Sequence, residues 1–186
     1  MDTTTKNNNS PILISGSHRS GTTWVGKILA SGEGCTYIHE PFNSGINISV
    51  SRFHGHLFEY AFNTNKFELA YRDIINYRYP LLENINKSDS LTDFGKICRD
   101  QSNFILAKLF NKRPIIKDPH AFFAAEYLHS KYHLNILIMI RHPAAFCSSL
   151  KIKNWSYDFN DLLEQKELIN EYLAPYEHEI REQAKN

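Results

Sequence analysis

Residues 11–24, Pro-Ile-Leu-Ile-Ser-Gly-Ser-His-Arg-Ser-Gly-Thr-Thr-Trp, join a short apolar run to a loop rich in glycine, serine and threonine. The apolar run at residues 12–14 is typical of a strand that is buried on both faces. Gly16 and Gly21 bracket the loop, and a helix is predicted to begin near Thr22. The first N–H groups of a helix lack intrahelical partners and lie at the positive end of its dipole. This stretch therefore predicts a phosphate-binding loop.

The two glycines have the spacing of a Walker A loop, G-x-x-x-x-G-K-[ST], with one departure. Thr22 stands where the lysine belongs, Thr23 keeps the hydroxyl position, and the basic residue is Arg19. In nucleoside triphosphatases that lysine reaches the β- and γ-phosphates. Without it, a small-molecule kinase with a degenerate loop is one alternative. A loop that only turns the chain is another.

Three further strands are predicted, and each ends in polar or charged residues. They are residues 35–38 before His39-Glu40-Pro41-Phe42, residues 113–117 before Asp118-Pro119-His120, and residues 134–140 before Arg141. Helical patterns between them predict right-handed crossovers and a mainly parallel sheet of about four strands. The fold class is thus an α/β, P-loop-like three-layer fold, with ligands at the carboxyl ends of the strands. Because residues 134–140 are the most apolar run, we expect them to form the central strand.

Residues 43–110 show the weakest α/β pattern and predict a helical insertion. Helical spacing is present at 58–62 and 67–75, and an Asn/Ser/Asp break spans 84–90. The aromatic residues of the insertion form either its own core or a wall that stacks on substrate. They include Phe53, Phe58, Tyr60, Phe62, Tyr71, Tyr77 and Tyr79.

The last segment, residues 155–186, predicts two helices. Leu162, Ile169 and Leu173 share a face of the first, and Pro175 suits the first turn of the second. Residues 1–10 are polar and are expected to be a disordered tail. Residues 11–186 are expected to form a single domain.

Composition limits the classes of partner. Of 186 residues, 42% are hydrophobic, and 21 Lys and Arg against 20 Asp and Glu give a net charge of +1. Such a balance offers no overall field for nucleic acid or an anionic membrane, so an anion must be bound locally. No apolar run approaches the roughly 20 residues of a membrane span, and the expected location is the cytoplasm. Three cysteines without C-x-x-C spacing predict reduced, mostly buried thiols. His54-Gly55-His56 lacks further ligands, so no metal is expected.

Six residues of the loop, Arg19-Ser20-Gly21-Thr22-Thr23-Trp24, resemble the 5′-phosphosulfate loop of sulfotransferases that use 3′-phosphoadenosine 5′-phosphosulfate (PAPS). Cytosolic members of that family have lysine at the Arg19 position. Tyrosylprotein and many carbohydrate sulfotransferases have arginine or another residue there. The resemblance implies that these six residues bind the donor.

A second resemblance lies after the fourth strand, where Arg141 is followed by Ser149 eight positions later. It is similar to the family motif that holds the 3′-phosphate, and an arginine can meet phosphate bidentately. The alternative is an arginine that only caps a strand. Lys117-Asp118-Pro119 is similar to a stretch of tyrosylprotein sulfotransferases, which implies that Lys117 stabilises charge on the phosphosulfate. Its alternative is a lysine paired with Asp118 in solvent.

The expected catalytic base is Glu40, because carbohydrate sulfotransferases present a similar Glu-Pro after the second strand. A cleft is expected to raise its pKa towards neutrality. His120 is the rival base, although the family has one residue between the strand-end lysine and its histidine, and here there are two. The implied reaction moves a sulfuryl group from PAPS to a hydroxyl acceptor, with a saccharide favoured, and requires no metal.

The resemblance is incomplete at the C-terminal end. Cytosolic members close over the donor with an Arg-Lys-Gly loop that is absent from this sequence, and the family usually continues well past this length. Golgi members carry a membrane anchor, which the sequence also lacks. The expectation is therefore either a short or truncated form, or a different segment that covers the adenine. An incomplete, non-catalytic nucleotide-binding domain is the third functional alternative.

Overall fold

The computed structural model describes residues 10–43, 60, 65–86 and 90–185. Within them, the strands β1 (Ile12–Gly16), β2 (Cys35–His39), β3 (Arg113–Lys117) and β4 (Asn135–Met139) form one sheet. The sheet is parallel throughout, in the order β2-β3-β1-β4. All four carboxyl ends therefore lie at the same edge, which confirms the predicted α/β class with about four parallel strands.

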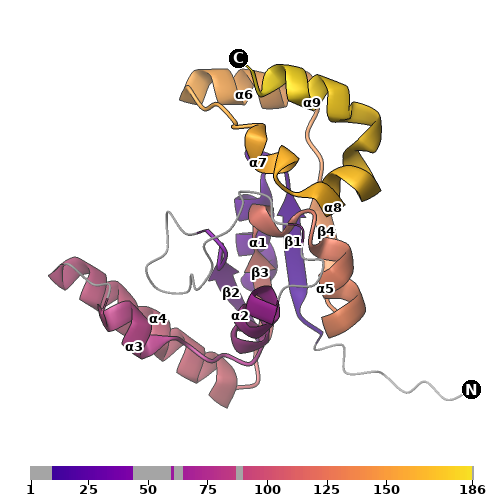
Figure 1. Ribbon diagram of the computed structural model, residues 1–186. Coiled ribbons are helices and arrows are strands. Elements are labelled where there is room, and N and C mark those ends of the chain that lie inside the picture. Colours follow the sequence, from indigo (N-terminus) through magenta and orange to yellow (C-terminus); the bar gives the residue numbers. More distant parts are fainter. Residues whose placement is uncertain (1–9, 44–59, 61–64, 87–89, 186) are drawn as a thin grey trace, which may run out of the picture.

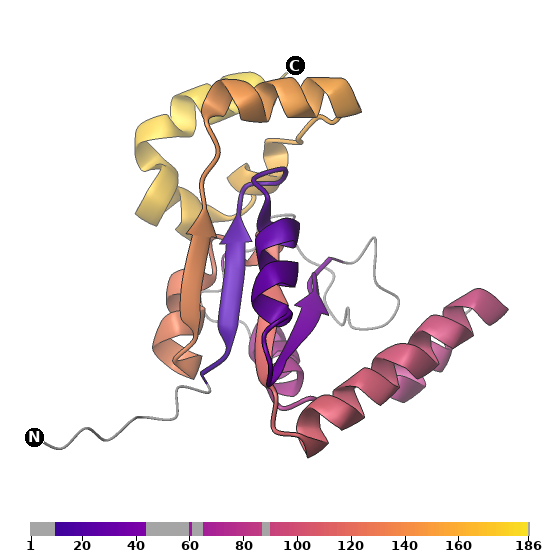
Figure 2. The same cartoon turned by 180° about the vertical axis from the view of Figure 1, so that it is seen from behind.

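Helices cover both faces of this sheet. Helix α1 (Thr22–Ala30) lies on one face, whereas α2 (Asn65–Ile75) and α5 (Ala125–Tyr132) lie on the other (Figures 1 and 2). Helix α6 (Pro143–Lys153) runs across the molecule above the carboxyl ends of β1 and β4 (Figure 2). Two layers of helix around a sheet give the expected three-layer arrangement, with the carboxyl ends of β1 and β4 beneath α6.

The main core lies between the sheet and helices α2 and α5, which cover one of its faces. Leu13 pairs in register with Ile116, which also pairs with Ile38, so all three side chains point to this face. All are buried, together with Tyr71 and Leu128 from the two helices. Helix α1 covers the opposite face of the sheet. The strand residues that alternate with these three core residues therefore point towards α1.

Of the aromatic residues singled out in the insertion, the four that the structure describes belong to cores. Tyr71 is fully buried and stacks on Phe42 at a ring-centroid distance of 4.7 Å. Tyr77 and Tyr79 meet Phe104 edge to face, at 5.8 and 5.4 Å. Tyr60 packs against the C-terminal segment instead. Phe53, Phe58 and Phe62 lie outside the described residues, as do residues 1–9 of the expected tail and His54 and His56.

The expectation that residues 134–140 form the central strand is wrong. β4 is an edge strand that pairs with β1, and the two inner strands are β3 and β1. Leu137 and Ile138 are partly exposed, and Ile140, just past the strand, is 89% exposed. An apolar run predicts burial rather than the number of neighbouring strands, and here even that burial is incomplete.

Every helix or strand that the structure describes within the insertion is a helix, as predicted. Besides α2 it contains α3 (Leu81–Asn86) and α4 (Leu91–Leu109), which pack together and project away from the sheet (Figure 1). Ser90 ends the break before α4, because its hydroxyl accepts a hydrogen bond from the N–H of Asp93 at 3.1 Å. This is the usual way in which a serine caps a helix.

The C-terminal segment differs from the two helices expected. It forms α7 (Asn160–Leu163), α8 (Lys166–Leu168), a π turn (Ile169–Leu173), a 3₁₀ turn (Ala174–Tyr176) and α9 (Glu177–Gln183). The first helix is interrupted at Gln165, whose buried side chain bonds two backbone groups, the Asp161 carbonyl at 3.0 Å and the Tyr60 N–H at 2.8 Å. Pro175 lies in the 3₁₀ turn that leads into α9.

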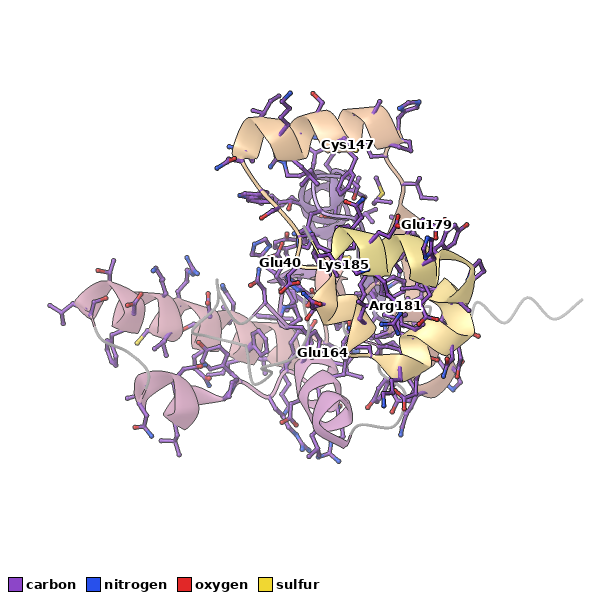
Figure 3. The ribbon with its side chains drawn as sticks, turned by 45° about the horizontal axis from the view of Figure 1, so that its top comes forward. Glu40, Cys147, Glu164, Glu179, Arg181 and Lys185 are labelled. Carbon is purple, nitrogen blue, oxygen red and sulfur yellow. The ribbon has the colours of Figure 1, made fainter. Side chains whose placement is uncertain are left out.

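The cysteines are free, as expected, but the prediction that they are mostly buried is wrong. Cys35 is half-buried, whereas Cys98 and Cys147 are exposed. Figure 3 shows Cys147 on α6, away from the sheet. Among the described helices, none combines the length and the apolar character needed to cross a bilayer.

Candidate functional site

The loop after β1 depends on residues that can adopt a left-handed backbone. Gly16 has φ 138°, and a Cβ there would lie 2.3 Å from the carbonyl oxygen of Met139 on β4. Arg19 has φ 64°, and Gly21, the N-cap of α1, has φ 93°. Both the N–H and the hydroxyl of Ser20 donate to the carbonyl of Ser17, at 3.3 and 2.6 Å. The loop therefore turns tightly and leaves the first N–H groups of α1 available to an anion.

The two predicted anion motifs meet at Arg19. Its Nε donates to the hydroxyl of Ser149 at 3.1 Å, and Nη1 of Arg141 donates to its backbone carbonyl at 2.7 Å. Ser149 is buried on α6, whereas Arg141 is exposed just before that helix. Residues 122 and 130 positions apart in the chain thus form one cluster beside the loop.

Glu40 and Lys117 form a buried ion pair at the ends of β2 and β3. Lys117 Nζ donates to Glu40 Oε1, and the two side chains are only 4% and 10% exposed. Glu40 Oε2 accepts a second bond from Asn43 Nδ2 at 2.7 Å, and the Glu40 N–H donates to the Lys117 carbonyl at 2.7 Å. The neighbouring strands and this backbone bond hold the two groups in one geometry. The alternative of a lysine paired with Asp118 in solvent is wrong.

The expected rise in the pKa of Glu40 is not observed. Burial alone would raise the pKa of this carboxyl, but the hydrogen bonds from Lys117 and Asn43 and the charge of Lys117 outweigh it. The net pKa lies below the ordinary value of 4.5. Glu40 is therefore ionised at neutral pH.

Asp118 holds the ends of three strands together. Its carboxylate accepts bonds from the N–H groups of Phe42 and His120, at 2.9 and 3.0 Å, and its carbonyl accepts one from the Ser15 hydroxyl at 2.8 Å. The side chain is fully buried, and this burial raises its pKa to about 7. Sequence reasoning gave Asp118 no such role, although its place before Pro119 is a helix-capping position.

Two histidines lie beside the ion pair. The rings of His18 and His120 meet edge to face with centroids 5.3 Å apart, and His120 is buried. Burial, and then the proximity of His120, lowers the pKa of His18 to about 4, so this ring is neutral at pH 7. The rival base therefore lies within the same cluster as Glu40. No role was predicted for His18, although it belongs to the loop between β1 and α1.

A cavity of about 470 Å³ opens among these groups. It is lined by His18, Arg19, Gly21, Thr22, Thr23, Trp24, Lys27, Glu40, Lys117, Pro119 and Trp155. Most predicted site residues thus share one cavity, but Arg141 and Ser149 reach it only through Arg19. Figure 3 shows Glu40 near the middle of the molecule. Neither Lys27 nor Trp155 stands in a recognisable sequence motif.

The cavity combines the loop before α1, one carboxylate and three cationic side chains. Such a set can hold a phosphate-like group, accept a proton and stabilise developing negative charge. No cluster of three or more His, Cys, Asp or Glu side chains suited to a metal ion occurs among the described residues.

Comparison with known proteins agrees with this arrangement. Residues 11–185 match a family model described as Sulfotransferase family. No curated protein and no solved structure matches the chain. The matched range contains the loop after β1, the ion pair and the arginine–serine cluster, so we conclude that the chain belongs to the sulfotransferase family.

Proposed function

We propose that the protein transfers a sulfuryl group from PAPS to a hydroxyl acceptor, with a saccharide as the favoured acceptor. The observation that carries the proposal is that the Glu40–Lys117 pair lines one cavity together with the loop residues Arg19, Gly21, Thr22 and Thr23. A proton acceptor and an anion-binding loop are thereby close enough to act on the same reacting group.

The donor is bound by two sets of residues in this proposal. The N–H groups at the start of α1 and the hydroxyls of Thr22 and Thr23 face the phosphosulfate, and Trp24 follows them on the cavity wall. Ser20 contributes by holding the loop in shape through its bond to the Ser17 carbonyl. Arg141 and Ser149 take the 3′-phosphate. Arg19 lies between the two, because it contacts Ser149 through its side chain and Arg141 through its backbone.

Glu40 acts as the general base. The acceptor oxygen attacks sulfur while its proton passes to the Glu40 carboxylate, and the bond between sulfur and the bridging phosphate oxygen breaks. Arg19 and Lys117 stabilise the negative charge that remains on adenosine 3′,5′-bisphosphate. The low pKa of Glu40 guarantees the ionised form at neutral pH, at the cost of a weaker proton acceptor.

The test of donor binding compares adenosine 3′,5′-bisphosphate with adenosine 5′-monophosphate by calorimetry. Wild type is expected to prefer the bisphosphate. Arg141→Ala is expected to weaken bisphosphate binding by roughly 10- to 150-fold, because a charge-assisted contact contributes about 1.5–3 kcal/mol. Ser149→Ala should cost less, since it removes a neutral group.

Arg181→Ala is the matched control, because Arg181 is an exposed arginine that pairs with Glu177 on α9 and lies outside the cavity lining. Equal affinity of wild type for the two nucleotides contradicts the proposal. Turnover of ATP with Mg²⁺ would favour the kinase instead. Transfer from labelled PAPS to a panel of glycans, phenols and lipids then identifies the acceptor class.

A further inference from the structure

The charged side chains of the cavity are unequal in number. Arg19, Lys27 and Lys117 are cationic, and Glu40 is the single carboxylate among its lining residues. Lys117 pairs with Glu40, and Arg19 bonds Ser149. Lys27 is exposed and has no ion pair or side-chain hydrogen bond with any residue that the structure describes. One cation of the cavity is therefore available to a ligand.

The position of Lys27 separates it from the donor's 3′-phosphate. Arg141 and Ser149 follow β4, at one edge of the sheet, whereas β2 forms the opposite edge. Lys27 lies on α1, which packs against β1, β2 and β3. Burial, opposed by the charge of Glu40, lowers the pKa of His39 at the end of β2, and Lys117 and Lys27 contribute to this lowering. Lys27 is thus close to the strand end that carries Glu40.

Glu40 is the group that contacts the acceptor hydroxyl in the proposed reaction, so its side of the cavity is the acceptor side. A donor with several negative charges makes this space unfavourable for a second anion unless a cation is present. The charge of Glu40 is already offset by Lys117. The charge of Lys27 is the one that remains there to attract an anionic acceptor.

Resting on the proposed sulfuryl transfer, we infer that the acceptor is an anionic hydroxyl compound, such as a saccharide with a uronic acid carboxylate, and that Lys27 binds its negative group. Lys27 would then be a specificity-determining residue. It would select among acceptors without contributing to donor binding or to proton transfer.

The structure provides a direct reporter for the test. The chain has two tryptophans, Trp24 and Trp155, and both line this cavity while being 70% and 52% exposed. Intrinsic tryptophan fluorescence therefore reports occupancy of the cavity. The acceptor probes are a methyl hexuronide and its neutral amide, which have the same ring hydroxyls and differ in charge.

The experiment titrates each probe into protein saturated with adenosine 3′,5′-bisphosphate, and measures kcat/KM for each with PAPS. Wild type is expected to bind the acid about tenfold more tightly than the amide, since one partly solvated charge contact distinguishes them. Lys27→Gln should remove this preference, because it weakens binding of the acid and leaves binding of the amide unchanged. Lys27→Arg should restore most of it. Lys108→Gln, on the exposed face of α4, is the matched control and should change nothing.

Two results would overturn the inference while leaving the reaction intact. In the first, wild type still binds the bisphosphate but binds the acid and the amide equally tightly, or binds neither of them. The other is a Lys27→Gln variant whose affinity for the bisphosphate falls while its acceptor preference persists, because Lys27 would then serve the donor. A wild type that does not prefer the bisphosphate to the monophosphate refutes the proposed function itself.

Discussion

Glu40 and Lys117 depend on each other because both are buried. Removing one partner of a buried ion pair leaves an uncompensated charge and typically costs about 3–5 kcal/mol. An amide at position 40 keeps a hydrogen-bond acceptor for Lys117 and removes the proton acceptor. This substitution therefore separates catalysis from folding better than alanine does.

We predict that Glu40→Gln lowers kcat by about 10²- to 10⁴-fold, the usual contribution of a general base, while bisphosphate affinity changes little. Radiolabelled sulfate transfer and calorimetry measure the two quantities. Glu179→Gln, on exposed α9, is the control. A larger loss in His120→Ala than in Glu40→Gln would make His120 the base.

The buried groups His18 and Asp118 predict opposite pH dependences of stability. The folded-state pKa of His18, about 4, lies below its ordinary 6.5, so between these values the unfolded state binds more protons and stability rises with pH. The folded-state pKa of Asp118, about 7, lies above its ordinary 3.8, so stability falls as pH rises from about 4 to 7.

Denaturant unfolding across pH 4–7 checks this prediction. Relative to wild type, Asp118→Asn should make the slope of unfolding free energy against pH more positive, and His18→Asn should make it more negative. Each change is limited to one proton, or about 1.4 kcal/mol per pH unit. Parallel curves for all three proteins would show that neither group titrates as assigned.

Residues that stand in a local motif could be predicted from the sequence. Arg19, Glu40, Lys117 and the Arg141–Ser149 spacing all stand in such motifs. Their partners could not be predicted, because Lys117 meets Glu40 across 77 positions and this contact reverses the expected pKa shift. Lys27 could not be predicted either, because a single lysine in a helix does not form a recognisable motif.

At the level of elements, α1 rests closely on the sheet because it carries Gly26. A Cβ at this position would lie 2.9 Å from the Tyr37 ring and 3.3 Å from Lys117 Cβ. The glycine is thus a packing requirement inside a helix, where glycine is normally unfavourable by about 1 kcal/mol relative to alanine.

We predict that Gly26→Ala destabilises the protein by about 1–2 kcal/mol, because overpacking typically costs about 1–3 kcal/mol and exceeds the gain in helix propensity. Gly95→Ala is the matched control, since a Cβ on α4 at this position meets no atom within 4 Å. That variant should gain about 0.5–1 kcal/mol. Chemical denaturation of both variants gives the comparison, and destabilisation of both by the same amount would contradict it.

The positions of the helices and strands in the chain were easier to predict than the way in which these elements pair and pack. All four strands follow from short apolar runs, but the sheet order does not, because a run reports burial and not pairing. β4 is the example, since its apolar side chains lie partly exposed at an edge. The break at Gln165 had no local signal either, because its partner Tyr60 is 105 positions away.

For the whole molecule, donor-site binding should appear as stability. A ligand at 100 times its Kd stabilises the native state by about 2.7 kcal/mol, which for a chain of this size corresponds to a Tm increase of about 5–10 °C. We predict this shift for adenosine 3′,5′-bisphosphate in differential scanning fluorimetry. Arg141→Ala should lose most of it at the same concentration, and Arg181→Ala should keep it. An equal shift with ATP and Mg²⁺ would contradict the assigned donor class.

The strand order also determines when the sheet can form. β1 and β2 are close in sequence, but β3 lies between them in the sheet, and β1 pairs only with strands that begin at Arg113 and Asn135. During synthesis the first two strands must therefore wait for more than half of the chain before either acquires a partner. Such distant pairing slows folding and exposes unpaired strand edges to other chains. The loop after β1 is synthesised early, but its contacts with Met139 and Ser149 form only after those residues have been made.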